Sequence, residues 1–466
     1  MTYTPTQGVR PTVPARRGPA PRRRAWAEGA DRLRTALTTE PGRLRLIGAV
    51  LTVLVVAFGA VTAWQITERA AAADRVVHRS SQVSRNAADI YRYLADADAT
   101  VSEGFLGTGQ EPAEDTARYQ KDITSAARLI TTAAASSAGS SEAAEQIVFL
   151  STRLPAYAQL VATAQADDRQ GFPLGAAYLR YADSQMQTRG GLLDSAAALY
   201  RIENDRLSRD YADAKALPWA AWVLGALVLT GLVWAQRRNY RRTNRVFNQG
   251  MLAASLACAM ALVWLVAGHT LARTRLSDSY VHGARSVQAL NNARITVLQA
   301  RSDENLTLVA RGSGQKYEDG FGAEMKKLTA DDPRDPGAQL AYALALADSA
   351  AGRDPVRAAI KKVRGWGAQH DSSRASDKAG EYDRAVAQVI GTDCDGRKVA
   401  DPAEECFRMV GSDLDAALAQ EQSEFARAAD SGHGALSLLP VGVALLALLA
   451  AAGTAIGIGR RLSEYR

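Results

Sequence analysis

The chain has 466 residues, of which 47% are apolar and only three are cysteine, and its formal net charge is +7. Three cysteines exclude a disulfide-framework protein and a zinc site built from four cysteines. The mean hydropathy is close to zero because it averages strongly apolar windows with highly charged segments.

Four windows contain no Asp, Glu, Lys, Arg or His, at residues 46–65, 217–236, 246–268 and 436–458. Each is long enough to cross ~30 Å of hydrocarbon at about 1.5 Å per residue. The first window has an alternative interpretation as a cleaved signal peptide. Its long preceding tail and its apolar run, which exceeds a signal core of about 7–15 residues, favour an uncleaved anchor. The sequence therefore predicts an all-α membrane protein with four transmembrane helices.

The charge is divided unevenly among the remaining segments. The long polar segments 66–216 and 269–435 carry −4 and −3, whereas the pieces 1–45, 237–245 and 459–466 carry +7, +5 and +2. Basic residues beside spans stay in the cytoplasm. We therefore expect a multi-pass protein of the cell membrane with both termini cytoplasmic, both long segments extracytoplasmic, and no nucleic-acid partner. The short basic loop contains Arg237, Arg238, Arg241, Arg242 and Arg245.

The two long segments lack strand patterning. Apolar residues recur every three or four positions over 76–105 and 186–211, which predicts amphipathic helices continuous with the first and second spans. Two inner helices are expected at 127–135 and 147–166, the latter interrupted at Pro155. Four antiparallel helices make a four-helix bundle. The second segment ends in a similar amphipathic helix over 407–428.

The two halves of the chain look like repeats of each other. A shift of 205 residues places the third span on the first and gives eight identities over positions 86–110. The alternative is two unrelated long helices with glycine turns. A tandem repeat of span, bundle and span fits the whole layout. The identical pairs are Asn86/Asn291, Ala88/Ala293, Ile90/Ile295, Ala95/Ala300, Asp98/Asp303, Gly107/Gly312, Gly109/Gly314 and Gln110/Gln315.

Cys394 and Cys406 lie in the second long segment, separated by eleven residues. Disulfides persist outside the cytoplasm, so we expect these two cysteines to be bonded, with two free thiols as the alternative. Closing so small a loop stabilises by roughly 3 kcal/mol in the chain-entropy model. Cys258 lies inside the third span and is interpreted as a packing residue.

No motif for catalysis, a cofactor or a metal site occurs, and the five histidines are scattered. The many carboxylates alternate with arginines at helical spacing, which is typical of solvated, salt-bridged helix faces. We therefore predict a protein that is not an enzyme and needs no cofactor. Asn305-Leu306-Thr307 matches a glycosylation sequon, a pattern that often arises by chance. Candidates for direct binding of a small molecule are Tyr91, Arg92, Tyr93, Tyr178, Arg180 and Tyr181, although such residues more often pack or snorkel.

The predicted cytoplasmic pieces are short. The first 25 residues are rich in proline and arginine, which suits binding to anionic lipid or docking of a cytoplasmic partner. A bundle whose outer helices continue into the membrane couples its two sides mechanically, so a sensor or relay that acts through another protein is the first hypothesis. A structural scaffold, whose bundles bind an envelope partner or a second copy of the chain, is the alternative. Gly453 and Gly457 form a GxxxG pattern that suits packing against a neighbouring helix.

In architecture the bundles resemble the ligand-sensing four-helix bundle of bacterial chemoreceptors. The whole layout, with its Ala/Arg-rich composition, is similar to that of actinobacterial GlnX-type membrane proteins, whose four spans enclose two outside helical regions. That resemblance implies two partners, an extracytoplasmic binding lipoprotein for amino acids and a cytoplasmic Ser/Thr kinase of the PknG type. It rests on layout and transfers no functional residue.

Overall fold

The computed structural model describes residues 40–106, 113–136, 140–243, 248–390, 405–437 and 439–463. Within these ranges every regular element is a helix, and four helices are long and apolar enough to cross a membrane. The predicted all-α fold with four spans is therefore confirmed. Two compact units are distinguished below: a span unit (Met1–Gly59, Val223–Met260 and Leu445–Arg466) and a bundle unit (Ala60–Trp222 and Ala261–Ala444).

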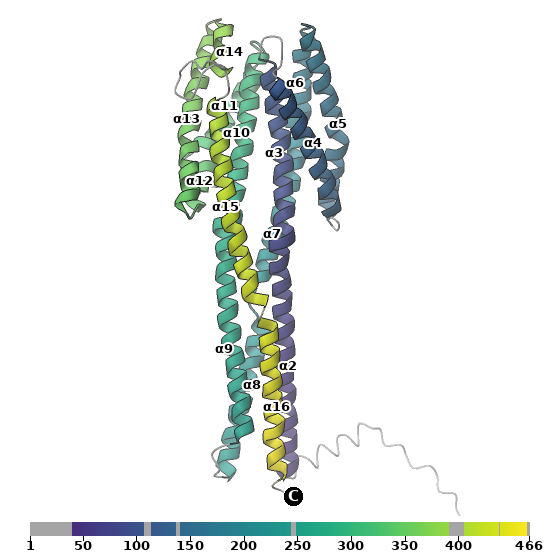
Figure 1. Cartoon of the computed structure of the whole chain (residues 1–466), viewed down its shortest axis with the longest axis vertical. Helices are drawn as coiled ribbons and strands as arrows, with labels where there is room; N and C mark the ends of the chain where they lie inside the picture. The colour runs from purple at the N-terminus through teal and green to yellow at the C-terminus, as the bar shows by residue number, and fades with distance from the viewer. Residues whose placement is uncertain are drawn as a thin grey trace, which may run out of the picture. The chain divides into compact units, whose positions relative to one another are not determined.

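The four spans lie on α2 (Glu40–Arg75), α8 (Trp219–Thr243), α9 (Gln249–Asp278) and α16 (Leu439–Ser463) (Figure 1). The basic stretch after the second span is not a loop as expected, because α8 continues to Thr243 and carries the first four arginines on its last turns. Arginine is a good helix former, and no glycine or proline ends the helix earlier. Arg245 and the side chain of Arg242 lie outside the described residues.

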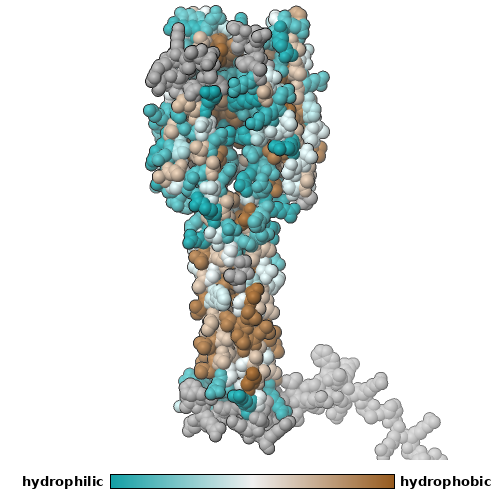
Figure 2. Space-filling view, in the orientation of Figure 1, coloured by the Kyte–Doolittle hydropathy of each residue, from teal (hydrophilic) through white to brown (hydrophobic). Residues whose placement is uncertain are grey.

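Figure 2 shows apolar side chains over much of the visible face of the span unit, which suits contact with lipid. Val53, Leu256 and Leu448 are each more than 60% exposed. The GxxxG pattern of α16 packs within the same chain: a Cβ added to Gly250 of α9 would lie 2.6 Å from the carbonyl oxygen of Gly453.

The first half of the bundle unit has five α-helices where the sequence predicts four. The break lies at Gly190, whose φ of 75° suits glycine, so the expected helix over 186–211 begins only at Leu192. The expected interruption at Pro155 is absent, because α5 continues through it; Pro155 and Ser151, whose carbonyl loses its helical donor, are both exposed residues. The elements are the π-helical turn η1 (Val76–Ser80), α3 (Ser81–Gly104), α4 (Ala113–Ser136), α5 (Ser141–Arg169), α6 (Leu174–Gln187) and α7 (Leu192–Lys215).

The second half also begins with a π-helical turn, η2 (Ser279–Ala284). The 205-residue shift takes 76–80 onto 281–285, which overlaps η2; the tandem repeat itself stays a prediction of the sequence. Cys394 and the side chain of Cys406 lie outside the described residues, so their disulfide also stays a prediction. The α-helices are α10 (Arg285–Val309), α11 (Gln315–Thr329), α12 (Gln339–Leu346), α13 (Ala350–Lys378), α14 (Tyr382–Ile390) and α15 (Glu405–Ser437).

The two halves share one hydrophobic core. Helix α3 packs against α10, and residues of both helices belong to the same buried cluster (Figure 1). Leu94 on α3 and Leu306 on α10 have no exposed surface. This pairing brings two segments about 200 residues apart in sequence into contact, and it positions the polar groups described next.

Candidate functional site

The centre of the α3–α10 contact is a buried carboxylate. Asp98 on α3 accepts hydrogen bonds from Ser302 Oγ (2.9 Å) on α10, Gln187 Nε2 (3.0 Å) on α6 and Tyr157 Oη (3.2 Å) on α5. A buried carboxylate without such donors would be strongly destabilising. Four helices are therefore tied to one side chain.

Two more buried carboxylates, Asp183 on α6 and Asp303 on α10, lie close to Asp98. Burial, reinforced by the charge of Asp98, raises the pKa of Asp183 to about 8. Burial, reinforced by the charges of Asp183 and Asp98, likewise raises the pKa of Asp303 to about 8. The nearest cation, Lys316 Nζ, is 3.9 Å from Asp183 and mostly exposed. The cluster therefore retains protons at neutral pH, where a protonated carboxyl group donates a hydrogen bond.

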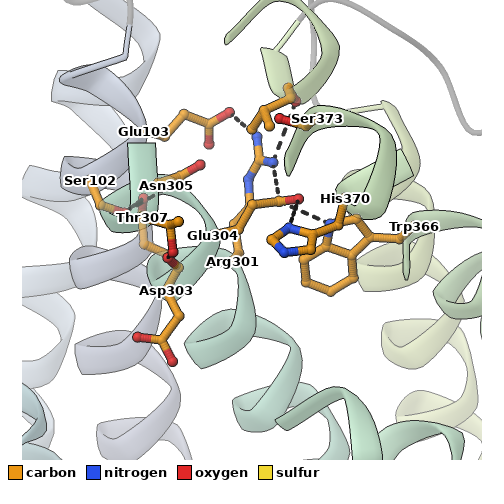
Figure 3. A network of polar contacts seen from close by, with 12 residues as sticks. Ser102, Glu103, Arg301, Asp303, Glu304, Asn305, Thr307, Trp366, His370 and Ser373 are labelled. Atoms are coloured by element: carbon orange, nitrogen blue, oxygen red, sulfur yellow. Dashed lines mark hydrogen bonds and ion pairs between the residues drawn. The ribbon is translucent and has the colours of Figure 1, made fainter. Parts of the chain in front are cut away.

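A second polar network is centred on Arg301 of α10 (Figure 3). Its guanidinium is 2.6 Å from Glu103 of α3 and 2.9 Å from Glu304 of its own helix. Arg301 and Glu304 are both buried. Burial alone would raise the pKa of Glu304, but the hydrogen bond with His370 and the charge of Arg301 hold it below its usual value. This buried ion pair joins the two halves.

The network continues from Glu304 into α13 and α11. Trp366 Nε1 donates to Glu304 (2.9 Å), and His370 Nδ1 lies 3.2 Å from the other oxygen of the same carboxylate. The second ring nitrogen of His370 is 3.3 Å from Glu318, and its ring stacks on Phe321 at 3.6 Å between centroids. A side chain on α3 is thus linked through α10 and α13 to α11.

Asn305 also bridges the halves, since its Nδ2 donates to Ser102 Oγ at 3.3 Å. The side chain has no exposed surface. The sequon that it begins is therefore inaccessible to glycosylation in the folded chain, and its role is to bond α3 to α10.

The candidates for direct small-molecule binding are not gathered into one site. Tyr178 and Tyr181 are exposed on α6. Arg92 on α3 lies 3.8 Å above the ring of Tyr93, a cation–π contact within one helix. These side chains therefore pack against neighbours or lie in solvent, which agrees with the alternative interpretation that such residues pack or snorkel.

A third group of contacts lies at the π-helical turns. Asp210 of α7 accepts from Arg75 Nε (3.0 Å) and from Ser80 of η1. The next residue, Tyr211, bonds to Ser279 of η2 (2.7 Å), and the ring of Tyr211 lies 5.1 Å from that of Tyr280. Helix α7 therefore contacts both π-turns through adjacent residues, which we call the α7 node.

The break between α7 and α8 is bound by α2. Arg69 donates from Nε to the carbonyl of Ala216 (2.6 Å) and from Nη2 to that of Leu217 (2.9 Å). Gln65 accepts from the backbone N–H of Ala221 at 3.2 Å. Side chains of α2 thus bond to backbone groups at the helix break. Within the bundle unit, α2 is therefore held to the start of α8.

These three groups of side chains can fix the positions of helices and can hold protons. In the described part of the chain, no set of three or more His, Cys, Asp or Glu side chains is arranged to hold a metal ion. Asp98 and Glu304 accept hydrogen bonds from neighbouring helices and so fix helix positions, whereas burial favours the protonated form of Asp183 and Asp303. Sequence periodicity could not have found them, because their partners lie in the other half of the chain.

Residues 72–212 match the family model of the actinobacterial sensor domain. The match covers η1, α3 to α6 and most of α7, including Asp98, Asp183, Asp210 and Tyr211. No curated protein and no solved structure matches the chain significantly. The first half of the bundle unit is therefore similar to an actinobacterial sensor domain, in a chain with four candidate membrane spans.

Proposed function

We propose that this protein is a transmembrane relay that passes a signal from an extracytoplasmic bundle unit to a cytoplasmic partner and performs no catalysis of its own. The match of residues 72–212 to a sensor domain supports the sensory part of this proposal. The excess of arginine beside the spans supports the orientation.

The observation that carries the proposal is the α7 node. Asp210 and Tyr211 bind the π-turns that end α2 and α9, and α7 itself leads into α8. A shift of one half of the bundle against the other must therefore change contacts on three of the four helices that enter spans. π-helical turns inside long helices are frequent at functional positions, and they provide a local element with two arrangements.

The identity of the partners rests on the resemblance in layout. We propose an extracytoplasmic solute-binding protein, such as an amino-acid-binding lipoprotein, on the outer side. On the inner side we propose a Ser/Thr kinase or another output protein. Both are consistent with a chain whose described helices build a bundle and spans.

Thiol labelling in intact cells tests the orientation and the relay together. In three separate variants a cysteine replaces Arg128 on α4, Arg384 on α14 or Arg238 on α8. Arg128 and Arg384 are exposed. The parent chain reports the background labelling. A membrane-impermeant maleimide should label positions 128 and 384 in intact cells, and position 238 only after permeabilisation. The opposite pattern would reverse the orientation.

The same assay reports coupling. Asp210→Asn weakens the bonds to Arg75 and Ser80, so it should change the labelling rate at position 238 several-fold through the helices alone. Asp213→Asn, an exposed change of equal charge on α7, is the matched control and should leave that rate unchanged. Equal rates in both variants would rule out the α7 node as the coupling element.

A further inference from the structure

A cavity of about 30 Å³ lies inside the bundle unit where α3, α7, α10 and α15 meet. Its lining includes Arg85 of α3, Asn204 of α7, Asn291 of α10 and Gln422 of α15. These are the four helices that lead to the four spans. The cavity also borders both π-turns, since its lining begins one residue after η1 and includes the last residue of η2.

Most of the lining surface is apolar, and the only charged side chain that lines the cavity, Arg85, is positive. Apart from Arg85, its polar groups are amides and hydroxyls, and no carboxylate lines it. Burial lowers the pKa of the Arg85 guanidinium, although a guanidinium stays charged in proteins. Its bonds to the Ser81 carbonyl and to Gln82 are both 3.3 Å, long for a charged donor. The site is therefore positively charged and retains donor capacity.

A second donor group lines the same cavity. The side chain of Asn204 accepts from Ser84 Oγ at 2.6 Å and is also hydrogen-bonded to the phenol of Tyr200, which lines the cavity as well. A carboxylate oxygen is a stronger acceptor than a neutral phenol, so a bound anion would compete for the N–H group of Asn204.

We propose that this cavity binds a small carboxylate anion, with its oxygens on Arg85 and Asn204 and its carbon chain toward Phe425. The volume admits the centres of roughly two or three water-sized groups, which corresponds to a molecule the size of acetate. This inference rests on the proposed relay function, because it names the chemical class of a ligand that contacts all four helices leading to spans.

Binding is tested on the full chain in lipid nanodiscs with ¹³C-acetate as the probe, followed by saturation-transfer NMR. Acetate should bind saturably, whereas methylammonium of similar size should not, because the lining offers a cation and no carboxylate. Arg85→Gln should weaken binding roughly ten- to a hundred-fold, the range expected for a charge-assisted contact. Arg128→Gln, the same change on an exposed face of α4, should leave affinity unchanged.

Asn204→Leu separates binding from folding. It removes the amide donor with little change in volume, so circular dichroism should report a folded protein that has lost acetate affinity about tenfold or more. No saturable binding to the wild type, or equal binding to all variants, would show that the cavity holds only water and would overturn the proposal. If acetate binds but does not change the rate of maleimide labelling at position 238, the binding site is supported and the relay function is contradicted.

Discussion

At the scale of single residues, the buried carboxylates of the α3–α10 contact decide how the fold responds to pH. Asp303 has a pKa near 8 in the folded chain against an ordinary value of 3.8. The folded state therefore binds one more proton than the unfolded state between these values. The contribution of Asp303 to the free energy of unfolding is therefore fully present at low pH and is lost as the pH rises through 8. Burial is the largest cause of this raised pKa; Asp183, Asp98 and Glu324 raise it further, while Lys316 lowers it.

Asp303→Asn should accordingly flatten the pH dependence of stability. The wild type should lose at most about 1.4 kcal/mol per pH unit from this group between pH 5 and 8. The asparagine variant stays neutral, so its unfolding midpoint at pH 8 should exceed that of the wild type. Thermal unfolding of the detergent-solubilised chain, followed by circular dichroism at several pH values, measures both effects.

Asp371→Asn is the control for this prediction, since Asp371 is exposed on α13 and the change in charge is the same. Its pH profile should match that of the wild type. An Asp303→Asn profile parallel to the wild type would mean that this carboxyl group titrates outside the range and holds no proton at neutral pH.

At the scale of elements, the sequence predicts what depends on local pattern. The four spans and the long amphipathic helices follow from runs and periodicity, and the structure contains them. The π-turns, the break at Gly190 and the continuous helix through Pro155 were not predicted. A π-turn has no compositional signal. The effect of a proline depends on whether the carbonyl left unbonded reaches water, which is a property of the packed structure.

The contact between α9 and α16 also belongs to the element scale. GxxxG occurs by chance in apolar helices, so only the structure shows that it is used. A Cβ on Gly453 would lie 2.8 Å from the backbone oxygen of Gly250, and the Nδ2 of Asn248 donates to Gly457 O at 2.7 Å. Because an added Cβ on Gly453 would meet backbone atoms, no flexible side chain could move aside to make room for it.

Gly453→Ala should therefore destabilise the span unit by about 1–3 kcal/mol, the usual cost of overpacking. Gly459→Ala on the same helix is the matched control, since an added Cβ there meets nothing within 4 Å. It should leave the unfolding midpoint in detergent unchanged or raise it slightly, because alanine favours a helix. A Gly453→Ala variant as stable as Gly459→Ala would show that the two helices do not pack at this point.

At the scale of the whole chain, the halves depend on each other. Every residue of α3 from Leu94 to Val101 is buried, and so is α10 from Ala300 to Val309. An amphipathic pattern predicts one buried stripe on a helix, so it could not show that these ends are buried on all sides. It also could not place Asp98, Ser102 and Glu103 against partners in the other half. The candidate site is therefore a product of the pairing of the halves.

Separate expression of the halves tests this dependence. Fragments 1–245 and 246–466, divided between α8 and α9, should copurify from cells that produce both. The buried bonds of Arg301 to Glu103, Ser302 to Asp98 and Asn305 to Ser102 join them. Arg301→Glu places a third carboxylate beside Glu103 and Glu304. Because an uncompensated buried charge costs about 3–5 kcal/mol, most of the second fragment should be lost from the complex.

Arg334→Glu makes the same charge reversal at an exposed position in the second half, so it should leave recovery unchanged. The spans of the two halves also pack together, as Gly48 on α2 against Ile458 on α16 shows. The comparison therefore depends on the ratio of recovered fragments between the two variants. Equal recovery would mean that the spans alone hold the halves together and that the buried network sets only the register of α3 on α10. A relay needs the stronger dependence, because a contact that adds nothing to the association of the halves has no free energy with which to bias the spans.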